Sequence, residues 1–118
     1  MRRLIIVVFI FISSFTTNIF AEVKIGIILG FTGPIETLTP AMAASAEIAF
    51  KEASDSGSLL GGEKISVVRA DSTCVDSAVA TAVAEGVVAQ GVVAIMGADC
   101  PGVTSAIASN VAVPNGVV

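Results

Sequence analysis

The chain has 118 residues, with six basic residues against ten acidic ones and a formal net charge of −4 at pH 7. No run of Lys or Arg follows residue 3, which argues against a nucleic-acid partner, because such proteins cluster basic side chains against phosphates. The chain has no His, Trp or Tyr, so the commonest general base and most aromatic stacking platforms are missing.

The first 21 residues are typical of an export signal. Arg2 and Arg3 precede an apolar run over residues 4–12, and a polar stretch then leads to Ala21, after which we expect cleavage. A transmembrane anchor is the alternative, but it needs about 20 consecutive apolar residues, and this run breaks at Ser13. Residues 1–21 are therefore predicted to be a signal peptide, and the mature protein is predicted to be exported.

The mature part alternates apolar segments of strand length with Ala-rich segments of helix length, separated by Gly and Pro. The predicted order is strand 23–29, helix 39–53, strand 64–70, helix 76–90, strand 92–96, helix 103–110, a turn at 114–116 and the start of a fourth strand at 117–118. This order is typical of βαβ crossovers. The predicted fold class is therefore α/β, with an open parallel sheet.

The first helix has a recognisable start. Thr39 followed by Pro40 predicts that the helix begins there, with the threonine hydroxyl capping exposed amides. The residues expected to face the core share helical spacing, and they are Met42, Ala46, Ala49, Phe50 and Ala53.

The sequence stops where the fourth strand is predicted to start. An unfinished parallel strand leaves unpaired backbone groups and an apolar edge. We therefore expect residues 22–118 to be the first, truncated part of a longer domain.

Three loops follow the predicted strands, over residues 30–39, 71–75 and 97–102. Ligands of open parallel sheets bind at the carboxyl ends of the strands, where such loops meet helix N-termini. The loop 97–102 is the best candidate, because its small residues allow close approach to the backbone and the next helix supplies free amides for a carboxylate. The alternative is that its glycines only make a tight turn.

The two cysteines of the chain, Cys74 and Cys100, follow the second and third predicted strands. In a parallel sheet both would lie at the same edge, and oxidising compartments allow such pairs to form disulfides. We expect a Cys74–Cys100 disulfide; the alternative is two buried free thiols.

Enzyme chemistry has weak support. Gly26, Gly30 and Gly33 are spaced GxxxGxxG, unlike the GxGxxG pattern of a dinucleotide loop. Cys100 as a nucleophile would have no histidine to activate it.

A cation site is the third chemical possibility, because three loops carry aspartates. Asp71, Asp76 and Asp99 supply one acid per loop and lack the dense spacing of a calcium loop. Asp71 is therefore interpreted as a strand-end residue and Asp76 as a helix cap.

Four segments carry a family resemblance: VKIGIILGFTGP, AEIAFKEAS, GGEKISVVRADSTCVDSAVA and GVVAIMGADCPGVTSAIA. Their order and spacing, with a cysteine after each of two strands, resemble the start of bacterial periplasmic binding proteins of the leucine/isoleucine/valine (branched-chain amino acid) type. The resemblance covers essentially the whole mature chain. It implies a type I periplasmic binding protein fold, with residues 22–118 as the first part of the N-terminal lobe of a two-lobed clamshell.

The resemblance also implies specific residues. In that family the two cysteines form a disulfide, which matches Cys74 with Cys100. The family's ligand contacts fall on two loops, and the matching residues here are Asp99, Cys100, Pro101, Gly102, Thr37 and Leu38.

Two of these positions depart from the family pattern. Pro101 stands where a serine typically offers its hydroxyl and amide to the ligand, and proline offers neither. Leu38 stands where an aromatic residue is often found. Because these two positions alter the grip on the carboxylate and one wall of the pocket, the expected ligand class stays broad: an amino acid, of the branched-chain type by resemblance, or a related small amide.

The function that the resemblance implies is the extracytoplasmic substrate-binding component of an ABC importer, with a membrane permease as its partner and without a cofactor. A ligand-sensing receptor ectodomain is the alternative, since the same lobes are reused for signalling, and a transmembrane segment downstream would favour it. An exported α/β enzyme would need a catalytic constellation encoded after residue 118.

Overall fold

A computed structural model describes residues 22–118, so the predicted signal peptide, residues 1–21, lies outside the described residues. The strands are β1 (Glu22–Leu29), β2 (Lys64–Asp71) and β3 (Val92–Gly97). The helices are α1 (Thr39–Asp55), the 3-10 turn η1 (Leu60–Gly62), α2 (Ser77–Val88), α3 (Pro101–Ile107), the π-helical η2 (Ala108–Ala112) and α4 (Val113–Asn115).

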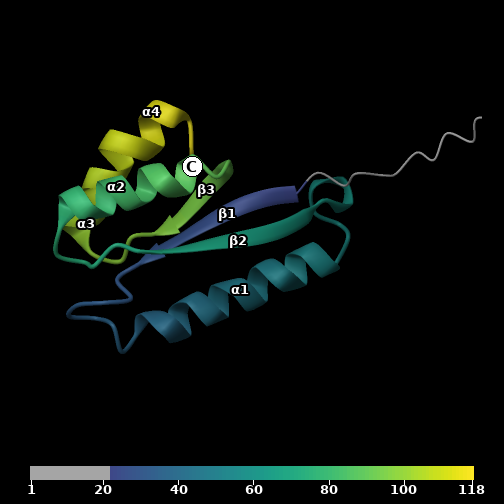
Figure 1. Ribbon diagram of the computed structural model, residues 1–118. Coiled ribbons are helices and arrows are strands. Elements are labelled where there is room, and N and C mark those ends of the chain that lie inside the picture. The colour runs from purple at the N-terminus through teal and green to yellow at the C-terminus, as the bar shows by residue number, and fades with distance from the viewer. Residues whose placement is uncertain (1–21) are drawn as a thin grey trace, which may run out of the picture.

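The three strands form a parallel sheet in the order β2-β1-β3. The β1–β2 register runs without interruption from Glu22↔Lys64 to Leu29↔Asp71, so both strands end at the same level. Helix α1 covers one face of the sheet, while α2, α3 and α4 lie on the other (Figure 1). The predicted α/β fold with an open parallel sheet is confirmed.

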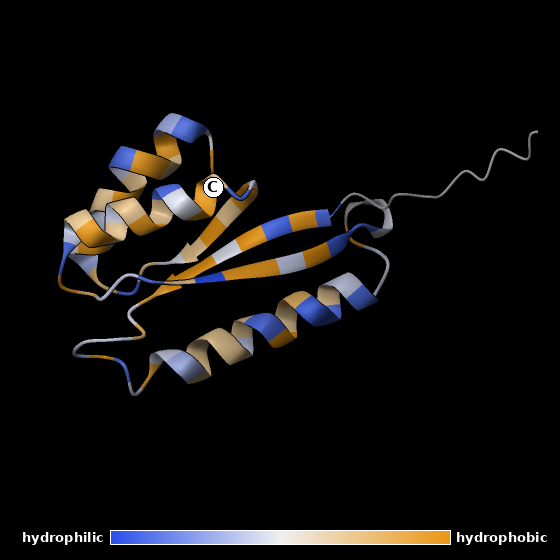
Figure 2. Ribbon diagram, viewed as in Figure 1, coloured by the Kyte–Doolittle hydropathy of each residue, from blue (hydrophilic) through white to orange (hydrophobic). Residues whose placement is uncertain are grey.

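The central strand β1 is buried on both faces. Ile27 and Leu29 pack with Ala43 of α1, whereas Ile28 faces the opposite layer. That layer supplies Ala80, Ala84, Val87, Val103, Ile107 and Val111. Figure 2 shows apolar residues concentrated along β1 and on the neighbouring α2. Each large apolar side chain buried in this way contributes about 1.5–3 kcal/mol, and alternating side chains of a strand reach both layers.

Helix α1 begins at Thr39 as predicted, but its buried stripe differs from the predicted one. Of the predicted residues, Ala46 and Phe50 do pack against the core and Ala53 is half-buried, but Met42 and Ala49 are exposed. The buried positions are Thr39, Ala43 and Ser54. Thr39 determines which face of α1 is buried, because its side chain is completely buried and its hydroxyl donates to the carbonyl of Gly30 at 3.0 Å. The predicted capping role of Thr39 is therefore wrong.

The last helical segment is longer than predicted. It begins at Pro101 rather than residue 103 and continues through η2 and α4 to Gly116, whose φ of +65° ends it. Pro101 suits the first turn because its missing amide is not needed there. Pro114 disturbs ordinary α-helical hydrogen bonding with the residue four positions earlier, and that residue lies within the π-helical segment.

Val118 lies beside β3. Its amide donates to the Val93 carbonyl at 3.3 Å, and its carbonyl accepts from the Ile95 amide at 2.6 Å. This is the bonding pattern of a parallel neighbour. The predicted fourth strand is thus represented in the described residues by this one pair of backbone hydrogen bonds.

Candidate ligand-binding site

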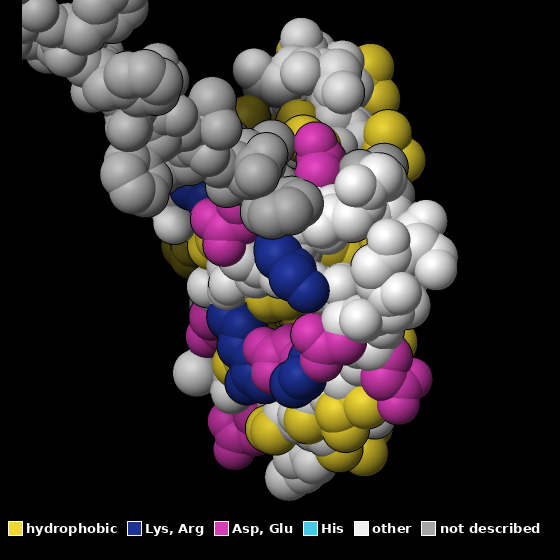
Figure 3. Space-filling view, turned by 90° about the vertical axis from the view of Figure 1, so that its right-hand side faces the viewer, with side chains coloured by type: hydrophobic (Ala, Val, Ile, Leu, Met, Phe, Trp, Pro, Cys, Tyr) yellow, Lys and Arg dark blue, Asp and Glu magenta, His cyan; other side chains and the backbone are white. Residues whose placement is uncertain are grey.

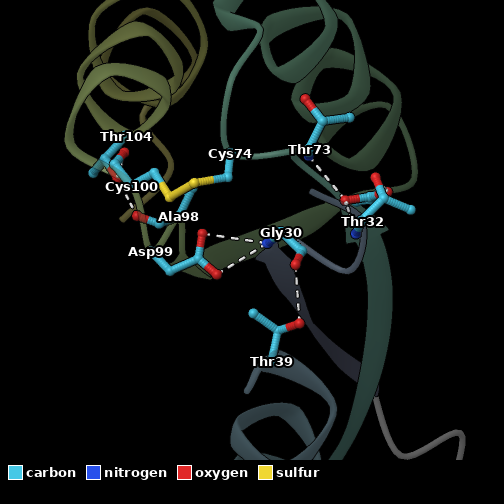
Figure 4. The surroundings of a disulfide bond; sticks show 10 residues. Gly30, Thr32, Thr39, Thr73, Cys74, Ala98, Asp99, Cys100 and Thr104 are labelled. Carbon is cyan, nitrogen blue, oxygen red and sulfur yellow. Dashed lines mark hydrogen bonds between the residues drawn. A yellow bond between two sulfur atoms is a disulfide. The ribbon is translucent and has the colours of Figure 1, made fainter. Parts of the chain in front are cut away.

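The carboxyl ends of β1, β2 and β3 bring three loops together (Figure 4). The loop after β1 covers residues 30–38, the loop after β2 covers residues 72–76, and the loop after β3 covers residues 98–100. The third loop is shorter than the predicted 97–102, because Gly97 completes β3 while Pro101 and Gly102 already belong to α3.

Asp99 connects the third loop to the first. The backbone amide of Gly30 donates to both carboxylate oxygens of Asp99, at 3.2 Å to Oδ1 and 2.9 Å to Oδ2. Figure 4 shows this carboxylate directed at the Gly30 amide, with the Thr39 hydroxyl directed at the Gly30 carbonyl. The end of β1 is therefore hydrogen-bonded both to the loop after β3 and to the start of α1.

Asp71, the last residue of β2, connects the start of the second loop to the first. Its Oδ1 accepts from the amides of Thr32 at 3.2 Å and Thr73 at 2.8 Å, and its Oδ2 accepts from the Thr32 hydroxyl at 2.6 Å. Partial burial by itself raises the pKa of Asp71, but these hydrogen bonds, with a further contribution from the Phe31 amide, outweigh it and lower the pKa below its usual range. The carboxylate is therefore held in its charged form.

The disulfide connects the second loop to the third. Cys74 and Cys100 are bonded, with their Cα atoms 5.3 Å apart, which confirms the predicted pairing. Thr73 and Cys74 both have positive φ angles, +58° and +68°. Residues with a β-carbon rarely adopt this conformation, so the turn that presents Cys74 is strained and must be held by its surroundings.

These three connections, Gly30–Asp99, Thr32–Asp71 and Cys74–Cys100, link the three loops pairwise and are called the loop ring below. Each loop is joined to the other two. Such a closed arrangement limits the movement of the loops relative to one another, so the surface that they form is largely fixed in advance.

The six residues that the resemblance placed at the ligand divide into two groups. Thr37 and Leu38 before α1, and Pro101 and Gly102 at the start of α3, are exposed to solvent. The Asp99 carboxylate is instead bonded to Gly30, and the Cys100 sulfur is bonded to Cys74. No hydrogen bond of the described residues joins Thr37 or Leu38 to residues 99–102.

Sequence reasoning missed Thr32, whose hydroxyl and amide both bind Asp71. It identified Asp71 as a strand-end residue and Asp76 as a helix cap. Both interpretations are confirmed, because Asp71 ends β2 and the Asp76 carboxylate accepts from the amides of Ala78 and Val79 at 2.9 and 3.1 Å. The available signal for Thr32 was its place three residues after the buried end of β1.

The other end of the sheet carries mixed charge, since Asp55 lies there between Lys51 and Lys64. Arg69 pairs with Glu47 at 2.5 Å nearer the carboxyl end of β2. Figure 3 shows basic and acidic side chains side by side on that surface. Exposed pairs of this kind contribute about 0–1 kcal/mol each, so we interpret this end as a solvated surface.

An apolar hollow of about 160 Å³ lies beside β3. It is lined by Ile95, Gly97, Ala98, Thr104, Ile107, Ala108, Ala112 and Val118. Sites for small molecules usually exceed about 300 Å³ and combine apolar walls with several polar groups. The volume of this hollow is below that range.

A family sequence model and two solved structures point to the same kind of protein. The sequence model of the family described as "Periplasmic binding protein" matches residues 22–118. The branched-chain amino acid transporter substrate binding protein LivJ from Streptococcus pneumoniae, solved in complex with isoleucine, is 30% identical with a TM-score of 0.72. An ABC transporter structure from Rhodopseudomonas palustris is 28% identical with a TM-score of 0.62. No curated protein matches the chain.

These alignments cover 82% and 81% of this chain but only 27% and 28% of the two solved proteins. The chain thus spans about a quarter of the length of the structures that it matches. The likeness confirms the expected type I periplasmic binding protein fold over this part. Because the family match covers every described residue, the chain belongs to the periplasmic binding protein family.

Proposed function

We propose that this chain is part of the extracytoplasmic substrate-binding component of an ABC importer, and that its ligand is an amino acid of the branched-chain type or a related small amide. The observation that carries the proposal is the loop ring at the carboxyl ends of the strands, where ligands of parallel sheets bind. The likeness to LivJ, whose structure holds isoleucine, supports the ligand class.

The proposed ligand contacts are the exposed members of the predicted set. Gly102, without a side chain, lets a ligand approach the first turn of α3, where backbone amides favour a carboxylate. Leu38, with 61% of its surface exposed, supplies an apolar wall. Asp99 and Cys100 contribute through their backbone, because their side chains are engaged within the loop ring.

The same proposal includes the organisation of the whole protein. Residues 1–21 direct export to the periplasm, and residues 22–118 form the first part of the N-terminal lobe. The rest of that lobe and a second lobe close over the ligand and present it to a membrane permease. The small share of the two solved proteins that this chain covers supports this organisation. No cofactor takes part, because binding uses hydrogen bonds and lobe closure.

Isothermal titration calorimetry on the full-length exported protein tests the ligand. The protein is first freed of bound ligand by unfolding and refolding with its disulfide intact. Leucine, isoleucine, valine and small amides are then titrated, with aspartate and lysine as polar controls. We expect one of the apolar amino acids or amides to bind with micromolar or tighter affinity. Binding of none of them would contradict the proposed ligand class.

A matched pair of variants tests the location. Leu38 and Ile48 are exposed to the same extent, 61% and 60%, but only Leu38 precedes α1 at the loop ring. We expect Leu38→Ala to weaken binding and Ile48→Ala to leave it unchanged. Equal effects of the two substitutions would place the ligand elsewhere. Residues 22–118 alone are expected to show no high-affinity binding, because they cover only about a quarter of the solved proteins that they match.

A further inference from the structure

The loop after β1 is held to the rest of the protein at few points. Within the loop, the Glu36 amide donates to Gly33 at 3.3 Å and the Leu38 amide donates to Ile35 at 2.9 Å, so these bonds only fold the loop on itself. At the start of the loop the Gly30 amide is bonded to Asp99, and beyond Gly30 the side-chain hydrogen bonds to another segment run from Thr32 to Asp71. Phe31 also packs against the core, with the Arg69 guanidinium 5.8 Å from the centre of its ring, so for residues 32–38 the polar anchor is the Asp71 carboxylate.

Asp71 is well suited to hold this loop. It offers Thr32 two acceptors in one direction and binds the Thr73 amide in the other, so a single side chain spans the two loops. The loops also approach closely at Gly33, where an added β-carbon would lie 2.5 Å from the Thr73 carbonyl oxygen. The Thr73 turn, strained by its φ of +58°, thus meets the loop at two points. Its amide shares the Asp71 carboxylate with Thr32, and its carbonyl oxygen faces Gly33.

We propose that Asp71 is a positioning residue for ligand binding: it fixes the loop 31–38, and with it Leu38, in the binding arrangement before the ligand arrives. Loss of this carboxylate weakens binding without removing a ligand contact, because the free loop must then be ordered during binding. The part of this inference that concerns affinity rests on the proposed function. The part that concerns the loop does not.

Hydrogen exchange of the ligand-free full-length protein tests the loop, with mass spectrometry of peptides that cover residues 31–38. We expect Asp71→Ala to raise exchange there by about tenfold, as for the loss of hydrogen bonds to a charged group. Asp76→Ala is the matched control, since Asp76 also accepts two backbone hydrogen bonds, but within its own loop and helix. Its effect is expected at the start of α2 only. Unchanged exchange of residues 31–38 in Asp71→Ala overturns the proposal.

Variants of Thr32 separate positioning from general destabilisation. Thr32→Ser keeps the hydroxyl that donates to Asp71 and is expected to retain wild-type exchange. Thr32→Val loses the hydroxyl bond but keeps the amide bond, so it is expected to raise exchange of the same residues, by less than Asp71→Ala does. The double variant Asp71→Ala/Thr32→Val is expected to be no worse than Asp71→Ala alone, because both changes break the same connection. Additive effects of the two changes would contradict a shared role.

Calorimetry with the ligand found for the wild-type protein completes the test. We expect Asp71→Ala to lower affinity by about tenfold and Asp76→Ala to leave it unchanged. Faster exchange of the loop with unchanged affinity overturns the positioning role. If the wild-type protein binds no amino acid or amide, the proposed function fails, and the exchange experiments still decide whether Asp71 holds the loop.

Discussion

The Asp99 carboxylate accepts the Gly30 amide through both of its oxygens, at 3.2 and 2.9 Å, and so joins residues 69 positions apart in the sequence. Asp99 was placed among the ligand contacts by family resemblance. Its side chain closes the end of the central strand and so fixes the backbone from which the loop 30–38 starts. Contact of Asp99 with a ligand stays a prediction.

Removal of this carboxylate is expected to destabilise the protein. Asp99→Ala leaves the buried Gly30 amide without its partner, and hydrogen bonds to charged groups contribute about 1.5–3 kcal/mol. Asp99→Asn keeps one acceptor oxygen and is expected to cost less. Urea unfolding followed by far-ultraviolet circular dichroism measures this, since the chain has no Trp or Tyr for fluorescence. Glu36→Ala, at an exposed position of the neighbouring loop, is the control, and an equal loss there would contradict a specific role of Asp99.

The disulfide is expected to stabilise the protein by roughly 3 kcal/mol, the value that chain entropy gives for a loop of this size. Cys74 and Cys100 are 26 residues apart in the sequence. The double variant Cys74→Ala/Cys100→Ala should lose this free energy of unfolding, and dithiothreitol should lower the stability of the wild type but not of the variant. Equal sensitivity of both proteins to the reductant would contradict the assignment.

Asp71 predicts a specific dependence of stability on pH. Its pKa is lower in the folded protein than in the unfolded chain, where it is about 3.9. The stabilisation is therefore fully present above the unfolded pKa and is lost as the pH falls through the folded pKa. The difference in unfolding free energy between the wild type and Asp71→Asn should be constant above about pH 5 and decrease below it.

Comparison with the variant is needed because other carboxylates respond in the same direction. The pKa of Glu47 is lowered by its hydrogen bond to Arg69, and that of Asp55 by its hydrogen bond to Lys51. Their contributions are common to both proteins and cancel in the difference. A difference that stays constant down to pH 2 would show that Asp71 has no altered pKa.

Gly33 is expected to be intolerant of a side chain. Its φ is +95°, and an added β-carbon would lie 2.5 Å from the Thr73 carbonyl oxygen. Gly57 has a φ of +66° and no atom within 4 Å of such a carbon, which makes it a matched control. Both substitutions by Ala carry the backbone cost of about 1–2 kcal/mol, and Gly33→Ala should lose at least a further 1 kcal/mol or so in urea unfolding. Equal losses would show that the two loops can separate freely.

The sequence by itself determined the order and type of the main elements. The apolar run of β1, the Thr39–Pro40 helix start and the Asp76 cap are local signals, because the residues that make them are neighbours along the chain. The Cys74–Cys100 pair was predictable for a related reason, since parallel strands place the residues that follow them at one edge.

Only the tertiary structure decided the partners of the loop residues. Gly30 meets Asp99 and Thr32 meets Asp71 because the strand order β2-β1-β3 puts the first strand between the other two, and periodicity along the chain carries no information on that order. The buried face of α1 was decided in the same way, by the Thr39 hydroxyl that reaches Gly30. Interactions between residues distant in sequence thus turn three predicted loops into one fixed surface.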